Sequence, residues 1–406
     1  MRYPVRGERM QPERAESDPH LLTPLLIMAA AIRIAVNNVA TYSRADETVY
    51  LLYAKALASG AGYPQIVRMY VDDPGMALFP HPLRWSWLVA TSLFCSATGE
   101  CSHRTLATLS TLAGILVVAL TYWIGRELFG PAVAAIAAAL AATSPLQLAL
   151  GRRALADEFF CASVLASVVA LLYFARATER RSRVAWLVAW IVTTTIAMAA
   201  KEQFFLVYPL VLLFWWLRTR RLGWREVMIW MLPPFLYAAM FCLLARDVTS
   251  FFRIARITTS TIGASYAEQF QSGPPHRLII DSLAIAPLVT LLAMAAVVSI
   301  ALRRSAFPAE HRHLAVLAAG IIAVHAAFPS QNIRYIVSAD SLLRVLVAAF
   351  LFVELREKKW MPALIVSGLL INTVVELWLF YDVFITGQVY DPVTDSLLRA
   401  LRMLPH

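Results

Sequence analysis

The chain has 406 residues, of which 59% are hydrophobic and only 15% are charged. Soluble domains carry about 25% charged residues, so this composition excludes a soluble globular protein and indicates an integral membrane protein. The net charge of +10 does not indicate nucleic-acid binding, because the basic residues lie in short clusters between apolar runs, as membrane-topology signals do.

Eleven apolar runs approach the length needed to cross a bilayer, and we predict a helix in each. The first run follows a polar arm without a cleavage site, so we expect a retained first helix. No internal repeat accompanies these runs, and we predict a single all-α polytopic domain at 21–382, between a cytoplasmic arm at 1–20 and an outer tail at 383–406. The predicted spans lie at about 21–36, 105–124, 132–150, 159–175, 184–200, 204–217, 227–245, 283–302, 314–328, 342–355 and 361–381.

The apolar run at 85–98 is too short to span and is rich in Trp and Phe, which is typical of an interfacial helix in the membrane plane. If it does not span, about half of the 36 Lys and Arg residues fall in short loops on one side. The positive-inside rule then places the N-terminus in the cytoplasm and the loops at 37–104 and 246–282 outside. We expect a multi-pass protein of the plasma (inner) membrane, in contact with membrane lipids, whose chemistry faces the periplasm.

Four cysteines are present. Cys161 and Cys242 lie in predicted spans and are expected to be packing residues. Cys95 and Cys101 lie on the predicted outer side, where an oxidising compartment would let them form a disulfide. We prefer the alternative, in which they are two small side chains near the interface.

Ionisable residues gather in segments that this topology places outside. Charges at the membrane edge are costly, so they are candidates for function. The structural alternatives are that the acids cap helices and that the cations contact lipid headgroups. Together they favour chemistry in which a carboxylate is the general base and guanidinium groups hold phosphate oxygens. The residues are Asp46, Glu47, Arg152, Arg153, Asp157, Glu158, Lys201, Arg334 and Tyr335.

His81 lies between two prolines, Pro80 and Pro82, which exclude a regular helix there and predict an extended turn before the interfacial helix. It either contacts substrate or caps that helix. The other histidines on the outer side show no ligand spacing, so we predict no metal, and no other cofactor.

In this order, these elements resemble the GT-C-type membrane glycosyltransferases, and in particular the protein O-mannosyltransferase and lipid A aminoarabinose transferase group. The resemblance covers residues 21 to about 354. It implies an inverting transferase that takes a hexosyl or pentosyl group from a polyprenyl-phosphate sugar; the acceptor is unknown. The matching elements are Asp46–Glu47, Phe79–Leu83, the turn Gly125–Gly130, the segment Thr143–Glu158, Lys201 and Arg334–Tyr335.

We predict that Asp46 is the general base; Glu47 is the rival, and the resemblance favours Asp46. Asp157 is expected to orient the acceptor or the base. The donor phosphate is assigned to Arg153, Lys201 and Arg334, and further substrate contacts to Arg152, Glu158, His81 and Tyr335. The loop at 246–282 is expected to border the acceptor.

The main alternative is a transporter or lipid flippase. Transporters usually carry their charges near the midplane, on broken helices in repeated halves. Here the charges are expected to lie at one membrane face, and no repeat is visible. A membrane acyl- or phosphotransferase would be expected to show a His or Ser nucleophile constellation, which the sequence does not offer.

Overall fold

A computed structural model describes residues 22–37, 45–261, 271–328, 330–355 and 359–404. The predicted cytoplasmic arm at 1–20 lies outside these residues. Within them the chain is helical, without a β-strand; residues Ser272 and Ser330 form one isolated antiparallel bridge. The prediction of an all-α fold is therefore confirmed.

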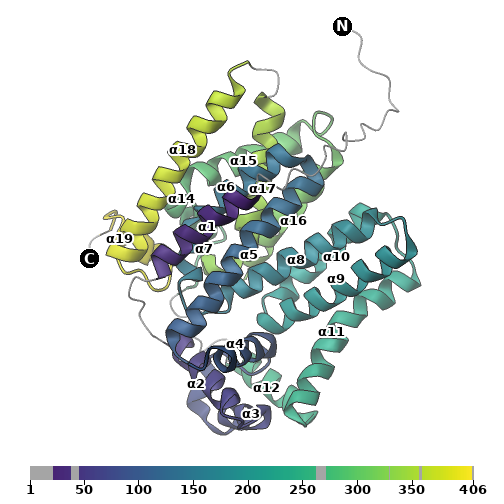
Figure 1. Ribbon diagram of the computed structural model, residues 1–406, viewed down its shortest axis with the longest axis vertical. Helices are drawn as coiled ribbons and strands as arrows, with labels where there is room; N and C mark the ends of the chain where they lie inside the picture. The colour runs from purple at the N-terminus through teal and green to yellow at the C-terminus, as the bar shows by residue number, and fades with distance from the viewer. Residues whose placement is uncertain (1–21, 38–44, 262–270, 329, 356–358, 405–406) are drawn as a thin grey trace.

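The helices follow the apolar runs closely (Figure 1). The first half of the chain forms α1 (Leu22–Asn37), α2 (Asp46–Ala58), α3 (Tyr63–Asp72), η1 (Pro74–Leu78), α4 (Trp85–Thr98), α5 (His103–Phe129), α6 (Pro131–Ala142), α7 (Pro145–Gly151), α8 (Asp157–Arg176) and α9 (Arg180–Ala200). The second half forms α10 (Phe204–Thr219), α11 (Trp224–Ala245), α12 (Thr249–Ser260), α14 (Arg277–Ile285), α15 (Pro287–Leu302), α16 (Ala309–Ala326), η3 (Ile333–Ile336), α17 (Val337–Leu355), α18 (Met361–Leu379), η4 (Phe380–Thr386) and α19 (Thr394–Ala400).

Each predicted span coincides with a helix or, at 132–150, with the two helices α6 and α7. Of the described helices, six are long and apolar enough to cross a membrane, or seven if the bent pair α6 and α7 is one span. Helices α1, α10 and α15 are apolar but shorter. The helical fold is thus established, whereas length and composition identify only six or seven crossings, and the predicted count of about eleven stays a prediction.

The bend of 57° between α6 and α7 has a local cause. Pro145 begins α7, and a proline disfavours helical geometry in the residue before it, Ser144. The Ser144 hydroxyl instead accepts a hydrogen bond from the backbone N–H of Gln147. The break exposes backbone carbonyls at the end of α6, and Arg33 of α1 donates to the carbonyl of Ala142 at 3.0 Å.

Four helices, α2, α3, α4 and α12, gather at one end of the bundle in Figure 1, where the long helix α11 also ends. At 14 residues α4 is about 21 Å long, shorter than a bilayer core. A disulfide between Cys95 and Cys101 closes the turn between α4 and α5. Our preferred interpretation of these two cysteines as unpaired small side chains near the interface is therefore wrong; the short loop brings their Cα atoms to 4.7 Å, within bonding reach.

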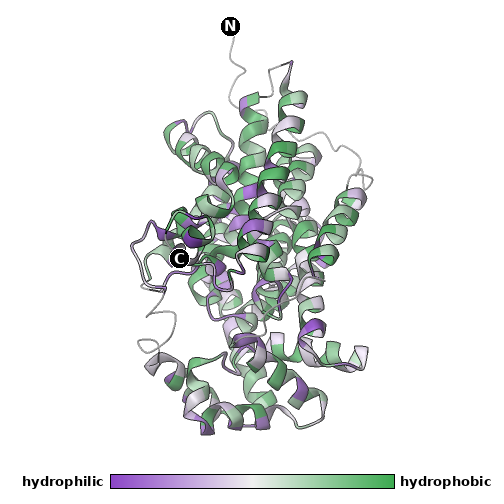
Figure 2. Ribbon diagram, turned by 90° about the vertical axis from the view of Figure 1, so that its left-hand side faces the viewer, coloured by the Kyte–Doolittle hydropathy of each residue, from purple (hydrophilic) through white to green (hydrophobic). Residues whose placement is uncertain are grey.

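The long helices bring alternate loops to opposite ends. Helices α8, α10 and α17 begin near one another, where α9 ends, and this end carries most of the predicted site residues. The ends away from it carry different ion pairs, Arg176–Glu127, Arg218–Glu310 and Arg303–Glu354. Figure 2 shows helices that are mostly hydrophobic, with hydrophilic stretches concentrated in the connecting segments.

Candidate active site

Six of the predicted residues come together at one end of the bundle, and we call them the site cluster. They come from five segments: α2, the α7–α8 connection, the start of α8, the α9–α10 turn and η3. The site cluster consists of Asp46, Glu47, Arg153, Asp157, Lys201 and Arg334.

Asp157 is the anchor of this cluster. As the first residue of α8, its carboxylate receives Lys201 Nζ at 2.6 Å and Arg334 Nη2 at 3.2 Å. Its side chain is only 1% exposed. A carboxylate buried this deeply needs paired cations to offset its lost hydration. Asp157 therefore holds the two cations in place and is shielded from direct contact with a substrate.

Arg334 is fixed from both sides. The Asn332 side chain caps η3 by accepting from the Arg334 backbone N–H at 2.9 Å, which sets the direction of the chain. The guanidinium Nη2 lies between Asp157 and Asp46, at 3.2 and 3.5 Å from their carboxylate oxygens. One cation thus links a buried carboxylate to an accessible one.

The two neighbouring acids Asp46 and Glu47 lie in different environments. The Asp46 side chain is 29% exposed, and its contact with Arg334, at 3.5 Å, is long. The Glu47 side chain is 2% exposed and forms an ion pair with Arg153 at 3.0 Å. Neighbouring residues on a helix point about 100° apart, so α2 buries one acid and presents the other.

Arg153 combines three contacts with an unused donor. Its Nε reaches Glu47, its Nη1 donates to the Tyr390 carbonyl at 2.7 Å, and its guanidinium lies 3.6 Å from the centre of the Tyr390 ring. Among the described residues, Arg153 Nη2 is buried without a hydrogen-bond partner. Because an unpaired buried donor is costly, this atom is a place where an anion would bind favourably.

A second group of charged residues is centred on Glu202, which directly follows Lys201. Glu202 receives Arg84 through two hydrogen bonds and His81 Nε2 at 3.4 Å, while Arg84 also donates to the Tyr50 hydroxyl. Although burial alone would raise it, Arg84 and His81 hold the pKa of the Glu202 carboxyl well below its usual range. His81 is thus held by Glu202, the residue that directly follows Lys201 in the chain.

Of the remaining predicted residues, two lie beside the site cluster and one lies inside the bundle. Tyr335 lies close to the site cluster, with its ring centre 5.5 Å from Lys201 Nζ. Arg152 is buried beside Arg153, and burial lowers its pKa. Glu158 is fully buried, and its carboxylate and the Arg33 guanidinium both lie against Gly114. A Cβ added to Gly114 would lie 3.4 Å from Glu158 Oε2 and 2.9 Å from Arg33 Nε, so Glu158 is turned toward Arg33. The structure therefore places Glu158 inside the bundle and away from the accessible carboxylate.

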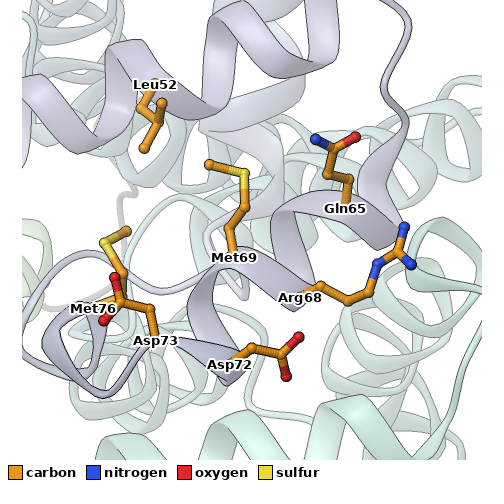
Figure 3. Close-up of a pocket in the computed structure, with 7 residues that line it drawn as sticks. All are labelled: Leu52, Gln65, Arg68, Met69, Asp72, Asp73 and Met76. Atoms are coloured by element: carbon orange, nitrogen blue, oxygen red, sulfur yellow. The ribbon is translucent and has the colours of Figure 1, made fainter.

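A surface groove of about 660 Å³ lies apart from the site cluster, between α2, α3 and η1 (Figure 3). None of its lining residues belongs to the cluster. They are Leu52, Gln65, Arg68, Met69, Asp72, Asp73 and Met76.

Sequence reasoning missed a second set of charges, which we call the core cluster. Arg344 of α17 donates to Glu376 of α18 at 2.8 and 3.0 Å and to Asp340 at 3.1 and 3.2 Å. Thr143 donates to Glu376, and Ser144 and Gln147 donate to Asp340. A signal was present: charged residues within apolar runs at helix spacing, as Asp340 and Arg344 are, point to buried pairs.

Comparisons with known proteins identify one family and several solved structures with a similar fold. The family model described as dolichyl-phosphate-mannose-protein mannosyltransferase matches residues 20–262. A sequence comparison with curated proteins finds no match.

Solved structures with a similar fold include two GT-C glycosyltransferases. ArnT from Cupriavidus metallidurans, solved with undecaprenyl phosphate, has a TM-score of 0.54 at 14% identity, over 90% of this chain and 76% of that one. The oligosaccharyltransferase of Archaeoglobus fulgidus, tethered to an acceptor peptide, has a TM-score of 0.57 at 14% identity, over 90% of this chain and 55% of that one.

Proposed function

The chain belongs to the dolichyl-phosphate-mannose-protein mannosyltransferase family of GT-C glycosyltransferases, and on that premise we propose that it moves a sugar, with inversion, from a polyprenyl phosphate to a hydroxyl acceptor at the outer face of the membrane. The observation that carries the proposal is the bridge made by Arg334 between accessible Asp46 and buried Asp157. A base and a phosphate-binding cation therefore lie side by side.

In the proposed reaction, Asp46 is the general base. The acceptor hydroxyl attacks the anomeric carbon from the face opposite the phosphate and gives its proton to the Asp46 carboxylate. The bond between the anomeric carbon and the phosphate oxygen breaks, its electron pair stays on the phosphate, and the configuration inverts. Exposure favours Asp46 over Glu47 for this role, because a base must reach the hydroxyl it deprotonates.

The leaving phosphate gains charge as the bond breaks, and positioned cations stabilise that charge. Arg334 and Lys201 are assigned to this task, with Arg153 Nη2 as a further donor. Protonation of Asp46 also removes the negative charge that faces Arg334. The guanidinium is then attracted more strongly to the phosphate at the moment when the phosphate needs it.

The ligands of solved structures with a similar fold support a lipid-linked donor. ArnT was solved with undecaprenyl phosphate, and AglB of Archaeoglobus fulgidus, with a TM-score of 0.53 at 14% identity, was solved with a dolichol-phosphate. A phosphate on a long apolar chain would enter from the membrane, and the cations here lie at the ends of apolar helices. Family membership favours this function over the transporter or flippase alternative.

We propose the predicted topology for the whole chain: eleven spans, a cytoplasmic N-terminus, α4 at the interface and the site cluster at the periplasmic face of the inner membrane. The Cys95–Cys101 disulfide supports this orientation, since disulfides persist in oxidising compartments and this one lies at the end of α5 nearer the site. Reporter fusions after Tyr381 and within residues 176–183 should report outside and inside, respectively; the reverse signal from either would contradict the model.

The segment at 246–282 is proposed to border the acceptor. Its described parts include α12 and Gln271, whose side chain donates to Asp391 in the C-terminal tail. Residues 262–270 lie outside the described part of the chain.

The test is transfer by purified protein from a panel of radiolabelled polyprenyl-phosphate sugars, with cell-envelope fractions as acceptors. We expect transfer from at least one of these donors and none from the matching nucleotide sugars. Transfer from nucleotide sugars alone would overturn the proposed donor, and accumulation of unmodified lipid across vesicles without transfer would favour a flippase.

A further inference from the structure

The C-terminal segment Tyr390–Thr394 is attached to the site by side chains from separate loops. Arg153 of the α7–α8 connection donates to the Tyr390 carbonyl and lies against its ring. Arg277 at the start of α14 donates to the Thr394 hydroxyl at 2.7 Å. Between these two contacts, the Asp391 carboxylate is the acceptor for two amide side chains.

Asp391 receives Asn332 Nδ2 on one oxygen and Gln271 Nε2 on the other. The two amide-bearing segments are themselves joined, since the Gln331 backbone N–H donates to the Gln271 carbonyl at 2.9 Å. One carboxylate thus fastens the tail to both loops.

Asn332 connects this carboxylate to the cation of the site. Its Nδ2 donates to Asp391, while its Oδ1 accepts from the backbone N–H of Arg334. With both ends of the amide engaged, Asn332 has one orientation, and so does the turn that aims the Arg334 guanidinium at Asp46 and Asp157.

We infer that Asp391 is a positioning residue for transfer, which acts through Asn332 to hold Arg334 against the donor phosphate. The inference rests on the proposed function for the identity of the phosphate, but the hydrogen-bond chain from tail to cation stands independently of the sugar. It gives the tail beyond the last apolar helix a role in lipid-phosphate binding.

The choice of residue type supports the inference. A carboxylate only accepts hydrogen bonds, so it can satisfy two amide N–H donors at once. An asparagine at this position would turn its own NH₂ toward one of them, and one bond would be lost. Displacing a phosphate-binding group by about 1 Å is enough to lose on the order of 10²-fold in rate.

The test uses full-length protein with two measurements, affinity for undecaprenyl phosphate and thermal unfolding, together with sugar transfer. Asp391→Asn should weaken undecaprenyl phosphate binding about tenfold or more and lower kcat/KM for the donor by on the order of 10- to 100-fold. Asn332→Asp alone should do the same, because it sets two carboxylates against each other.

The double variant Asn332→Asp/Asp391→Asn exchanges donor and acceptor. The new amide at position 391 would then donate to the new carboxylate at position 332 and still accept from Gln271. That carboxylate would in turn still accept from the Arg334 backbone N–H. We expect the double variant to recover binding to within about threefold of wild type, a non-additivity that identifies the pair. Asp395→Asn is the matched control, an exposed acid four residues along the same segment, and should leave binding and transfer unchanged.

The outcomes separate the two proposals. Normal binding by Asp391→Asn, or a double variant no better than the single ones, overturns the positioning role. If wild type binds undecaprenyl phosphate and the exchange behaves as expected, but no sugar is transferred, the positioning role stands and the proposed reaction fails. If wild type does not bind undecaprenyl phosphate, both are overturned.

Discussion

The site cluster and the core cluster both pair carboxylates with cationic side chains, but their hydrogen-bonding groups are satisfied to different degrees. In the core cluster all three nitrogens of Arg344 donate, and Arg344 and Glu376 are 0% and 1% exposed. In the site cluster Arg334 meets Asp46 only at 3.5 Å, Asp46 is 29% exposed, and Arg153 keeps an unpaired Nη2.

This difference is what we expect between an ion pair that stabilises the fold and one that takes part in a reaction. Charges buried inside an apolar bundle must be paired and hydrogen-bonded, and the core cluster meets that condition across α6, α7, α17 and α18. In the site cluster Asp157 is fully paired, whereas Asp46 has only a long contact with Arg334 and Arg153 has an unpaired donor. The incomplete pairing of this cluster leaves the Asp46 carboxylate partly exposed and one buried donor of Arg153 unpaired, which is the arrangement that the proposed reaction requires. Substitutions in the two clusters should therefore lower different quantities, activity in one and stability in the other.

The largest expected effect is at the accessible acid. Asp46→Asn is nearly isosteric but cannot take a proton, so turnover should fall by roughly 10²–10⁴-fold with folding and undecaprenyl phosphate binding near normal. Single-turnover transfer and thermal unfolding on the same sample measure both quantities. Substituting Lys201 or Arg334, in contrast, should weaken donor binding as well as turnover, because these charges act on the phosphate before and during transfer.

Glu47→Gln is the comparison that assigns the base. Because Glu47 is buried against Arg153, its loss should loosen Arg153 and raise the KM for the donor more than it lowers kcat. An active Asp46→Asn beside an inactive Glu47→Gln would show that the base is misassigned. Two active variants would reduce the acidic pair to a helix cap and end the catalytic interpretation of this loop.

The core cluster should respond in the opposite way. Glu376→Gln leaves Arg344 buried with a weaker partner, and breaking a buried pair costs about 3 kcal/mol of unfolding free energy. Transfer per folded molecule should stay near wild type. Glu354→Gln is the control, since its pair with Arg303 is exposed and should contribute less than about 1 kcal/mol. A large loss of turnover with unchanged thermal unfolding in Glu376→Gln would make the core cluster part of the reaction.

The sequence predicts the two regions unevenly. The helices follow from apolar runs of membrane length, and alternating loops bring Asp157, Lys201 and Arg334 to one end once the crossings are counted. The different exposures of Asp46 and Glu47 could not be predicted from the sequence, because both residues adjoin the same helix start. The core cluster was overlooked because its members lie inside or at the edges of runs assigned to spans, although their charge was the signal.

Other features depended on packing that local patterns do not encode. Nothing in the spacing of the tail indicates that Tyr390 covers Arg153 or that Asp391 meets Asn332, since these contacts join segments more than 50 residues apart. The bend at Ser144, in contrast, was predictable in principle from Pro145, which the single span at 132–150 ignored.

The smallest expected effect is a shift in pH dependence at Lys201, the cation that faces Asp157, Arg334 and Tyr335. Burial lowers the pKa of the Lys201 ammonium below its ordinary value of 10.5, although Asp157 opposes the shift. As the pH rises, Lys201 should therefore lose its proton earlier than an exposed lysine, and kcat/KM should fall.

The contribution of Lys201 to the unfolding free energy should instead rise with pH over the range in which kcat/KM falls. Between the folded and unfolded pKa values of Lys201, the unfolded chain binds more protons, so the unfolding free energy contributed by this group rises with pH. Lys201→Arg keeps its charge at every accessible pH, and its basic limb should lie at higher pH, with kcat/KM near neutrality reduced about tenfold by the different shape of the guanidinium. Matching basic limbs in wild type and Lys201→Arg would assign the titration to another group, and a parallel loss of thermal stability would assign it to unfolding.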